Sequence, residues 1–399
     1  MKKGWEYKKL GEIFPYIKNG ANIKQSKGAG GIPITRIETL ANGVFNYDRL
    51  GYADIIDAGK YEKNILSKGD ILMSHINSLE HIGRAIAYKG DKKIIHGMNL
   101  LRLIPIESVN TDYCCFYFKT QNFKKAILSI THKSVNQASF NTSSLKSLSI
   151  PLPPLSEQKE IVEYLDSSFA KIDKLKENAA KNLEEAKALF QSALKDALEP
   201  KKGWEKKTIG EMGEIKVGPF GSMLHKKDYI VGGTPLINPM HISNGKIFIN
   251  PAFSVCQKKC EELSSYIMQQ NDIVIGRRGE IGRCAVVGIL ENGCVCGTGC
   301  MFLRTNISIC NPFFIQQLLS SDYIRKKLEE ISGGATMKNL SSTALSRFAI
   351  SIPPLSEQQE IVSLLDSLNE KVNTLQQNYS RICDECDALK QAILRQVFE

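Results

Sequence analysis

One helix entrance occurs twice in this chain, as PPLSEQKEIVEYLD at residues 153–166 and as PPLSEQQEIVSLLD at residues 353–366. Three further pairs of phrases align: KKGWE at 2–6 with 201–205, KGDILMS at 68–74 with QNDIVIG at 270–276, and IGRAIAY at 82–88 with IGRCAVV at 281–287. Solenoid repeats have far shorter periods. The pattern therefore indicates a duplicated domain, each copy of which is followed by the same kind of connector.

Each connector is predicted to be a long helix. The Pro-Pro pair enforces an extended approach, after which Ser156 or Ser356 is placed to cap the helix. Apolar residues then recur at heptad spacing, which is typical of coiled coils and of partner docking. The predicted seam residues are Ile161, Leu165, Ile172, Leu175 and Leu189 in the first copy, and Ile361, Leu365, Leu368, Val372, Leu375, Tyr379, Ile382, Leu389 and Ile393 in the second. Asn182 either fixes the register of this seam or faces solvent.

The connectivity predicts the direction of the two helices. The first helix ends near Leu198 and the second lobe begins at Lys201, so a second helix that packs on the first must run antiparallel to it. Glu399 would then lie near Met1. We expect an α+β fold with approximate two-fold symmetry and a nearly circular course. Its parts are residues 1–150 and 201–350 as recognition lobes of mixed α/β structure, and residues 151–200 and 351–399 as central helices.

The charge distribution favours a polyanionic partner for the lobes. Residues 1–150 contain 22 Lys and Arg against 12 Asp and Glu, and residues 201–350 contain 19 against 12. Both connectors carry more acids than bases. Nucleic acid would therefore be drawn to the lobes rather than to the helices.

Composition also indicates the state of the cysteines and the cellular compartment. Of 11 cysteines, most lie at irregular spacing in the second half, which favours reduced thiols over a disulfide framework. No apolar run is long enough for a membrane span, and the N-terminal stretch is charged, so we expect a cytoplasmic protein without membrane contact. Cys294, Cys296 and Cys300 match no standard metal spacing, so we predict buried thiols and no metal.

Motifs for catalysis are missing from the sequence. There is no phosphate-binding loop, dinucleotide fingerprint, nucleophile elbow or His-Glu-x-x-His motif. NPMH at 238–241 lacks the second proline and the aromatic residue with which amino-methyltransferases hold a flipped base. We therefore predict a chain that is not itself an enzyme.

The lobes instead contain loops suited to contacts with DNA, in which Arg, Lys, Asn and Gln can reach bases or phosphates. In the first lobe the predicted contacts are Lys24, Lys27, His75, Asn77, His81, Arg84, His132, Lys133, Asn136 and Gln137. In the second lobe they are Lys216, Phe220, Ser222, His225, Lys226, Lys227, Arg277, Arg278, Arg283, Thr336, Lys338 and Asn339. Arg84 and Arg283 occupy equivalent positions, which fits either a shared structural contact or a shared phosphate clamp.

Two lobes that open with Gly-Trp and close with a Pro-Pro-Leu-Ser-Glu-Gln helix resemble the specificity subunit of type I restriction-modification systems. GPFGS at 218–222, RRGEIG at 277–282 and LSIPLPPLSEQKEIV at 148–162 are similar to phrases of that family. The first lobe departs from the pattern, because KNGANIKQSKGAGG at 18–31 lacks the GPFGS phrase.

The resemblance implies that each lobe reads one half of a split double-stranded DNA target and that the helices set the gap between the halves. It also implies two adenine methyltransferase subunits docked on the helices, and restriction/translocase subunits that join them. S-adenosylmethionine and ATP would bind those partners, with no cofactor on this chain. Two other hypotheses remain: a stand-alone DNA-binding regulator, which would bind its site tightly without partners, and a coiled-coil adaptor, whose binding would depend little on salt.

Overall fold

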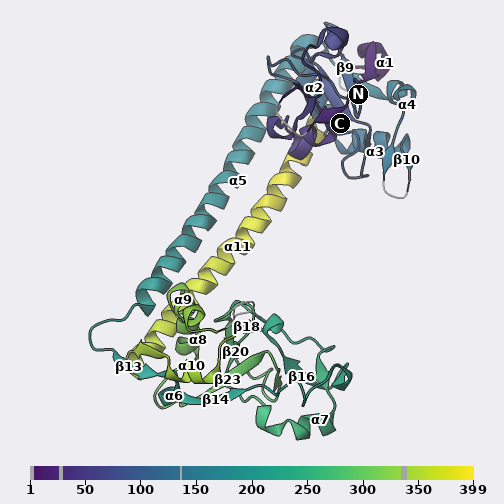
Figure 1. The fold of residues 1–399 in the computed structure, drawn as a ribbon. Helices are drawn as coiled ribbons and strands as arrows, with labels where there is room; N and C mark the ends of the chain where they lie inside the picture. The colour runs from purple at the N-terminus through teal and green to yellow at the C-terminus, as the bar shows by residue number, and fades with distance from the viewer. Residues whose placement is uncertain (1–3, 27–29, 135–136, 334–338) are drawn as a thin grey trace. The chain divides into compact units, whose positions relative to one another are not determined.

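The computed structural model describes residues 4–26, 30–134, 137–333 and 339–399. It divides the chain into two compact units, of which the first comprises residues 1–180 and 379–399 and the second residues 181–378. Each unit therefore contains one lobe and a part of each long helix (Figure 1).

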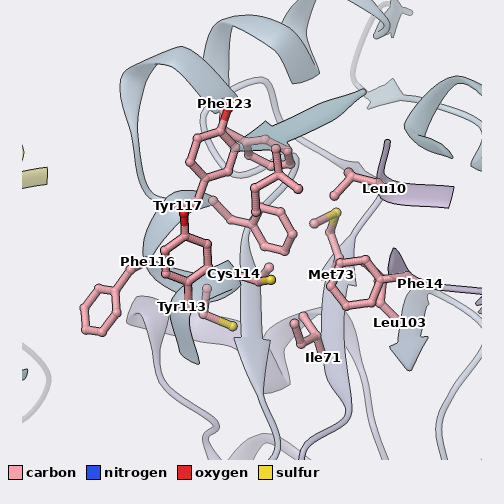
Figure 2. Close-up of a cluster of buried hydrophobic side chains, with 14 of the residues drawn as sticks. Leu10, Phe14, Ile71, Met73, Leu103, Tyr113, Cys114, Phe116, Tyr117 and Phe123 are labelled. Carbon is pink, nitrogen blue, oxygen red and sulfur yellow. The ribbon is translucent and has the colours of Figure 1, made fainter. Parts of the chain in front are cut away.

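The first unit is built around a four-stranded antiparallel sheet in the order β2-β9-β6-β8. These strands are β2 (Tyr16–Asn19), β9 (Leu100–Ile104), β6 (Ile71–Ser74) and β8 (Ala85–Ala87). Helices α1 (Leu10–Ile13), α2 (Thr111–Tyr117), α3 (Gln121–Ser129) and α4 (Thr142–Ser147) complete the lobe. Buried side chains from the sheet and from α1 to α3 form one hydrophobic cluster, in which aromatic rings are prominent (Figure 2).

A smaller sheet in the same unit has the order β3-β5-β4. Its strands are β3 (Gln25–Ser26), β5 (Gly51–Ala53) and β4 (Ile32–Ile34). The segments β7 (Ile76–Asn77), β10 (His132–Lys133) and β11 (Ala138–Ser139) form a third sheet in the order β10-β11-β7.

The second unit repeats the main sheet, with the order β14-β23-β20-β21. The strands are β14 (Gly213–Val217), β23 (Cys300–Thr305), β20 (Ile273–Gly276) and β21 (Cys284–Val286). Helices α6 (Ile209–Met212), α8 (Pro312–Ser320), α9 (Asp322–Glu330) and α10 (Ser342–Arg347) correspond to α1 to α4. A second small sheet, β15-β19-β16-β22, consists of Tyr229–Ile230, Ser254–Val255, Thr234–Ile237 and Val295–Cys296. The duplication read from the sequence is thus a duplication of structure.

In both lobes the first strand pairs with the last. β1 (Glu6–Lys9) is antiparallel to β12 (Ser149–Leu152), and β13 (Glu205–Thr208) is antiparallel to β24 (Ala349–Ile352). The last strand leads directly through the Pro-Pro pair into a long helix. These helices are α5 (Leu155–Leu198) and α11 (Leu355–Phe398), so the predicted helical connectors are present.

The repeated Pro-Pro-Leu-Ser-Glu-Gln phrase fixes each helix to its lobe through the glutamine. Gln158 is 1% exposed; its Oε1 accepts a hydrogen bond from the Asn110 amide at 2.8 Å. Its Nε2 donates to the carbonyl oxygens of Ser108 at 3.1 Å and Pro153 at 2.8 Å. The side-chain amide therefore joins the residues before α2 to the start of α5.

Gln358 repeats this arrangement in the second unit. It is 0% exposed, accepts from the Asn311 amide at 2.8 Å, and donates to Ile309 at 3.2 Å and Pro353 at 2.9 Å. The preceding glutamates accept hydrogen bonds from the two tryptophans, at 2.8 Å for Trp5 to Glu157 and 3.2 Å for Trp204 to Glu357.

The serines of the same phrase do not cap the helices as predicted. The amides of Gln158 and Gln358 donate to the carbonyl oxygens of Pro154 and Pro354, so each helix begins one residue before its serine. The proline carbonyl provides the first helical acceptor, which leaves the serine within the first turn.

Within the first unit, α5 and α11 run antiparallel. Asp173 pairs with Lys390 at 2.5 Å, and Lys176, one turn further along α5, pairs with Asp387 at 2.6 Å, one turn back along α11. Phe398 packs against the rings of Tyr113 and Tyr117, and Trp5 also contacts Tyr113, so the end of α11 lies close to Trp5. Met1, predicted to lie near Glu399, is outside the described residues. In the second unit, Leu194, Ala197 and Leu198 share a hydrophobic cluster with Ile361, Val362 and Leu365.

The predicted seam is correct in part. Leu165, Ile172, Ile361 and Leu365 are buried, while Ile161, Leu368, Val372, Tyr379, Ile382 and Ile393 are partly buried. The prediction is wrong for Leu175, Leu189 and Leu389, which are 57%, 71% and 48% exposed, and Leu375 is also 40% exposed.

The physical reason is that the contact face of α5 includes a second, neighbouring track. Besides Leu165 and Ile172 of the predicted track, the buried or partly buried positions include Val162, Phe169, Lys176 and Leu183. In α11 the last turns do the same, because Lys390 rather than Leu389 faces α5, with its ammonium 5.2 Å from the Phe169 ring. Asn182 is exposed, which agrees with the solvent-facing alternative.

Candidate nucleic-acid interface

In the first lobe, two loops that are far apart in the sequence form one surface. The segment 76–77 pairs with Ala138–Ser139, which pairs in turn with His132–Lys133. His132, Lys133 and the nearby Gln137 are exposed, and Asn77 is partly buried. The structure therefore places four of the predicted contacts along one small sheet.

The second lobe brings the equivalent loops together in the same way. Arg278 pairs with Asn339 as in an antiparallel ladder, and the Leu340 amide donates to the Arg277 carbonyl oxygen at 2.9 Å. The corresponding bond in the first lobe joins the Phe140 amide to the His75 carbonyl oxygen at 3.2 Å. Both lobes thus present the segment after their central strand, β6 or β20, beside the segment before α4 or α10.

The side chains at these equivalent positions differ. Arg278 is exposed, while Arg277 is partly buried and donates from Nε to Asn339 Oδ1 at 3.3 Å. Arg277 therefore orients the loop, and the Arg278 guanidinium is available to a ligand. Guanidinium forks suit guanine or phosphate. In the first lobe Ile76, which pairs with Ser139, stands at the position of Arg278, and the next residue is Asn77, whose amide group suits adenine.

His75 is a correction to the predicted contacts. It is 6% exposed, and its Nε2 lies 2.9 Å from the Asn19 amide nitrogen. Burial lowers the pKa of this ring, which favours the neutral form. This histidine, predicted from the sequence as a DNA contact, thus packs beneath the surface.

Arg84 and Arg283 have the structural role that the sequence left open. Arg84 donates to the Leu40 carbonyl oxygen at 3.3 Å, and Arg283 donates to the Pro239 carbonyl oxygen at 3.3 Å. His81 lies 3.0 Å from the Arg84 guanidinium. In the second lobe Glu280 takes the place of His81 and pairs with Arg283. These arginines tie the loop after the central strand, residues 75–84 or 277–283 and here called the reading loop, to a neighbouring segment.

Other predicted residues are placed as follows. Lys24 is exposed just before β3. Lys216 lies within β14, and its ammonium is 3.4 Å from Glu214. Phe220, Ser222, His225, Lys226 and Lys227 are all exposed on the loop between β14 and β15. Lys27, Asn136, Thr336 and Lys338 lie outside the described residues.

A glycine contact joins the loop after β14 to the reading loop. The Gly218 amide donates to the Cys300 carbonyl oxygen at 3.0 Å, and the Arg277 amide donates to the neighbouring Gly299 carbonyl oxygen at 3.0 Å. A Cβ at Gly218 would lie 2.0 Å from the Gly297 carbonyl oxygen, so no larger residue fits there. The GPFGS phrase is visible in the sequence, but this contact could not be predicted from it, because the contact depends on the backbone of a distant segment.

The first lobe has the same glycine contact although it lacks the GPFGS phrase. A Cβ at Gly20 would lie 2.1 Å from the His96 carbonyl oxygen, and the Ala21 amide donates to that same oxygen at 2.8 Å. In both lobes, therefore, the glycine after the first sheet strand lies against the backbone of a distant segment.

The cysteines of the second lobe are buried. Cys294 is 2% exposed, and Cys296 and Cys300 are 0% exposed. Burial raises the pKa of the Cys294 thiol to about 11 and raises the other two as well, so protonated thiols dominate near neutral pH. Within the described parts of the chain, no three His, Cys, Asp or Glu side chains converge as metal ligands.

The same described parts contain no helix with the length and apolar character needed to cross a membrane.

Comparison with protein families gives two matches on one chain. The model described as type I restriction modification DNA specificity domain matches residues 2–185 and again residues 201–382. The chain belongs to this family. Both matches begin at the start of a lobe and extend into the long helix that follows it, as the structural repeat does.

Two relatives in Methanocaldococcus jannaschii match over most of their length. The MjaX type I restriction enzyme specificity subunit is 33% identical over 391 residues, which cover 92% of this chain and 87% of the relative. The MjaVIII type I restriction enzyme specificity subunit is 22% identical over 393 residues, with 92% and 87% covered.

Two solved structures share the fold of this member of the specificity-domain family. The HsdS subunit from Thermoanaerobacter tengcongensis has a TM-score of 0.64 at 18% identity, covering 100% of this chain and 97% of that one. A chain from a study of the assembly and conformational transition of a type I restriction-modification system has a TM-score of 0.71 at 18% identity, covering 100% and 98%.

Proposed function

We propose that this chain is the DNA-recognition subunit of a type I restriction-modification complex and that it is not itself catalytic. Each lobe reads one half of an asymmetric, split DNA target. The observation that carries the proposal is the paired presentation of equivalent loops in both lobes, with different side chains at their exposed positions. Two lobes with the same backbone arrangement and different exposed loop side chains are suited to bind DNA at two different sequences.

Electrostatics support DNA as the ligand. The two lobes carry the positive excess of the chain, and Lys133, Lys226, Lys227 and Arg278 are exposed on the loops described above. Neutralising phosphates with such cations releases counterions and makes affinity fall steeply with salt.

The long helices are the proposed docking surface for methyltransferase subunits. In the first unit Leu175 and Leu389 are exposed, and each lies three residues after Ile172 or Cys386, whose side chains pack between the helices. Because the helices are antiparallel, these positions lie on the same face of the pair. In the second unit Leu189 and Leu375 are exposed as well. Exposed leucines of this kind mark a protein-binding surface and favour a complex over a stand-alone regulator.

The remaining parts of the proposal concern the partners. The methyltransferase subunits hold S-adenosylmethionine and methylate adenine, and restriction/translocase subunits hold ATP. The relatives named above are specificity subunits, and one solved structure comes from a study of type I complex assembly, which supports a role within such a complex. The helices set the gap between the two half-sites.

The test is binding of the chain with its methyltransferase partner to its methylated site, measured by fluorescence anisotropy from 50 to 200 mM salt. Six or more phosphate contacts would lower affinity by about 10³-fold over this range. Arg278→Ala should relax discrimination at one base of one half-site by about 1–3 kcal/mol. Lys8→Ala, which removes an exposed cation of β1 that is paired with Glu6, is the matched control and should change neither quantity. Salt-independent binding would refute the proposal and favour a protein-binding adaptor.

A further inference from the structure

The turn that follows β14 presents an aromatic ring among cations. Phe220 is 70% exposed, and His225, Lys226 and Lys227 on the same loop are exposed too. A large exposed apolar side chain on a basic surface needs a partner that offers both negative charge and a flat apolar face. Duplex DNA offers both, through its phosphates and its stacked bases.

The turn is held firmly at both ends. On one side Pro219 is buried and Gly218 is bound to the Cys300 carbonyl oxygen. On the other side Leu224 is 6% exposed and belongs to a hydrophobic cluster with Leu236 and other residues of the small sheet. The Met223 amide donates to the Phe220 carbonyl oxygen at 2.9 Å, which closes the turn. The backbone is therefore fixed while the ring projects from it.

The position of the turn places the ring beside the reading loop. Gly218 and Arg277 bind consecutive carbonyl oxygens, those of Cys300 and Gly299. Phe220 is the second residue after Gly218, and Arg278 directly follows Arg277. A DNA duplex that meets the Arg278 guanidinium therefore lies within reach of Phe220.

The first lobe lacks this ring. Its Gly20 makes the equivalent close approach, here to the His96 carbonyl oxygen, and the second residue after it is Asn22. Asn22 is exposed and polar. The two lobes thus share the glycine contact but expose different side chains two residues later, Phe220 in the second lobe and Asn22 in the first.

We propose that Phe220 inserts between two adjacent base pairs of the half-site read by the second lobe and unstacks that step, while the first lobe leaves its own half-site stacked. This inference rests on the proposed function. Apolar side chains flanked by cations are the groups that proteins use to wedge base steps apart. The lost stacking is offset by contact of the ring with the base faces, and the flexible pyrimidine–purine steps open most easily.

The experiment uses the full chain with its methyltransferase partner and duplexes with 2-aminopurine at single purines other than the methylated adenine. Binding should raise the 2-aminopurine fluorescence at one step of the second lobe's half-site and at no position of the other half-site. Phe220→Ala should abolish the rise and weaken binding by about 5- to 150-fold, the range for loss of one aromatic stack. Phe220→Trp should retain both. Phe313→Ala, which removes another exposed ring of the same unit, is the control and should retain both as well.

Each other outcome overturns the inference. A fluorescence rise that survives in Phe220→Ala means that Phe220 is not the wedge, and a rise in neither half-site of the parent complex means that no step is unstacked. Loss of methyltransferase assembly in Phe220→Ala, with normal fluorescence of the remaining complex, would assign the ring to a protein partner. Salt-dependent DNA binding by the parent complex in any of these cases leaves the proposed function intact, whereas its absence removes the proposed function itself.

Discussion

The glutamine that ends the repeated Pro-Pro-Leu-Ser-Glu-Gln phrase should be a major determinant of the stability of each lobe. Gln358 is 0% exposed and makes three hydrogen bonds to the backbone, at 2.8, 2.9 and 3.2 Å. Each such bond contributes about 1 kcal/mol net, and truncation leaves one buried amide and two carbonyl oxygens without this partner. Gln358→Ala should therefore lower the free energy of unfolding of the second unit by about 3 kcal/mol.

Urea unfolding followed by tryptophan fluorescence measures this effect locally. The chain has 2 tryptophans, so a Trp5→Phe background leaves Trp204, which is bonded to Glu357, as the reporter. Gln359→Ala is the matched control, because Gln359 is exposed and accepts one bond from the Asn311 side chain; it should cost less than about 1 kcal/mol. Equal effects of the two substitutions, or a Gln358→Ala effect below about 0.5 kcal/mol, would refute the reasoning.

Three further predictions concern backbone approach, thiol chemistry and the helical spacer. Gly218→Ala should destabilise the second unit by about 1–3 kcal/mol in the same urea assay, because its Cβ would lie 2.0 Å from a carbonyl oxygen, while Gly221→Ala, with nothing within 4 Å, should be neutral. A thiol reagent at pH 8 should label exposed Cys256 rapidly and Cys294 only on unfolding, since burial raises the Cys294 thiol pKa to about 11; equal rates would contradict this. Four residues inserted into either long helix add about 6 Å and should lengthen the preferred gap in the DNA target by one or two base pairs, as mapped by modified adenines; an unchanged gap would contradict the spacer role.

Much of the fold could be predicted because the two halves of the chain repeat each other and can be aligned. The repeat predicts the two lobes, and the connectivity predicts that the long helices are antiparallel. The ion pairs of Lys176 and Lys390 confirm this direction. The seam of α5 was misplaced because two neighbouring tracks both carry apolar residues. Hydrophobic spacing could not show that Lys176 lies toward α11 through its bond to Asp387 while Leu175 faces outward.

The candidate site was less predictable, because it is formed by tertiary contacts. Sequence composition singled out the loops around Arg278 and Asn339 but could not show that they pair, nor that Arg277 supports Asn339. His75 lies in a polar stretch of sequence that is typical of a surface loop. It is nevertheless buried, because it packs beneath the small sheet next to Phe140. The glutamine at the helix entrance was visible as a repeat, but its backbone partners come from a loop about fifty residues away.

The most direct measurement is the exchange of residues 1–150 for the first lobe of another family member, followed by long-read mapping of modified adenines in cells that carry the system. If each lobe reads one half of the target, the new methylation motif keeps the half-site of the second lobe and the gap, and changes only the other half-site. A motif that changes in both halves, or in neither, would contradict independent reading by the two lobes.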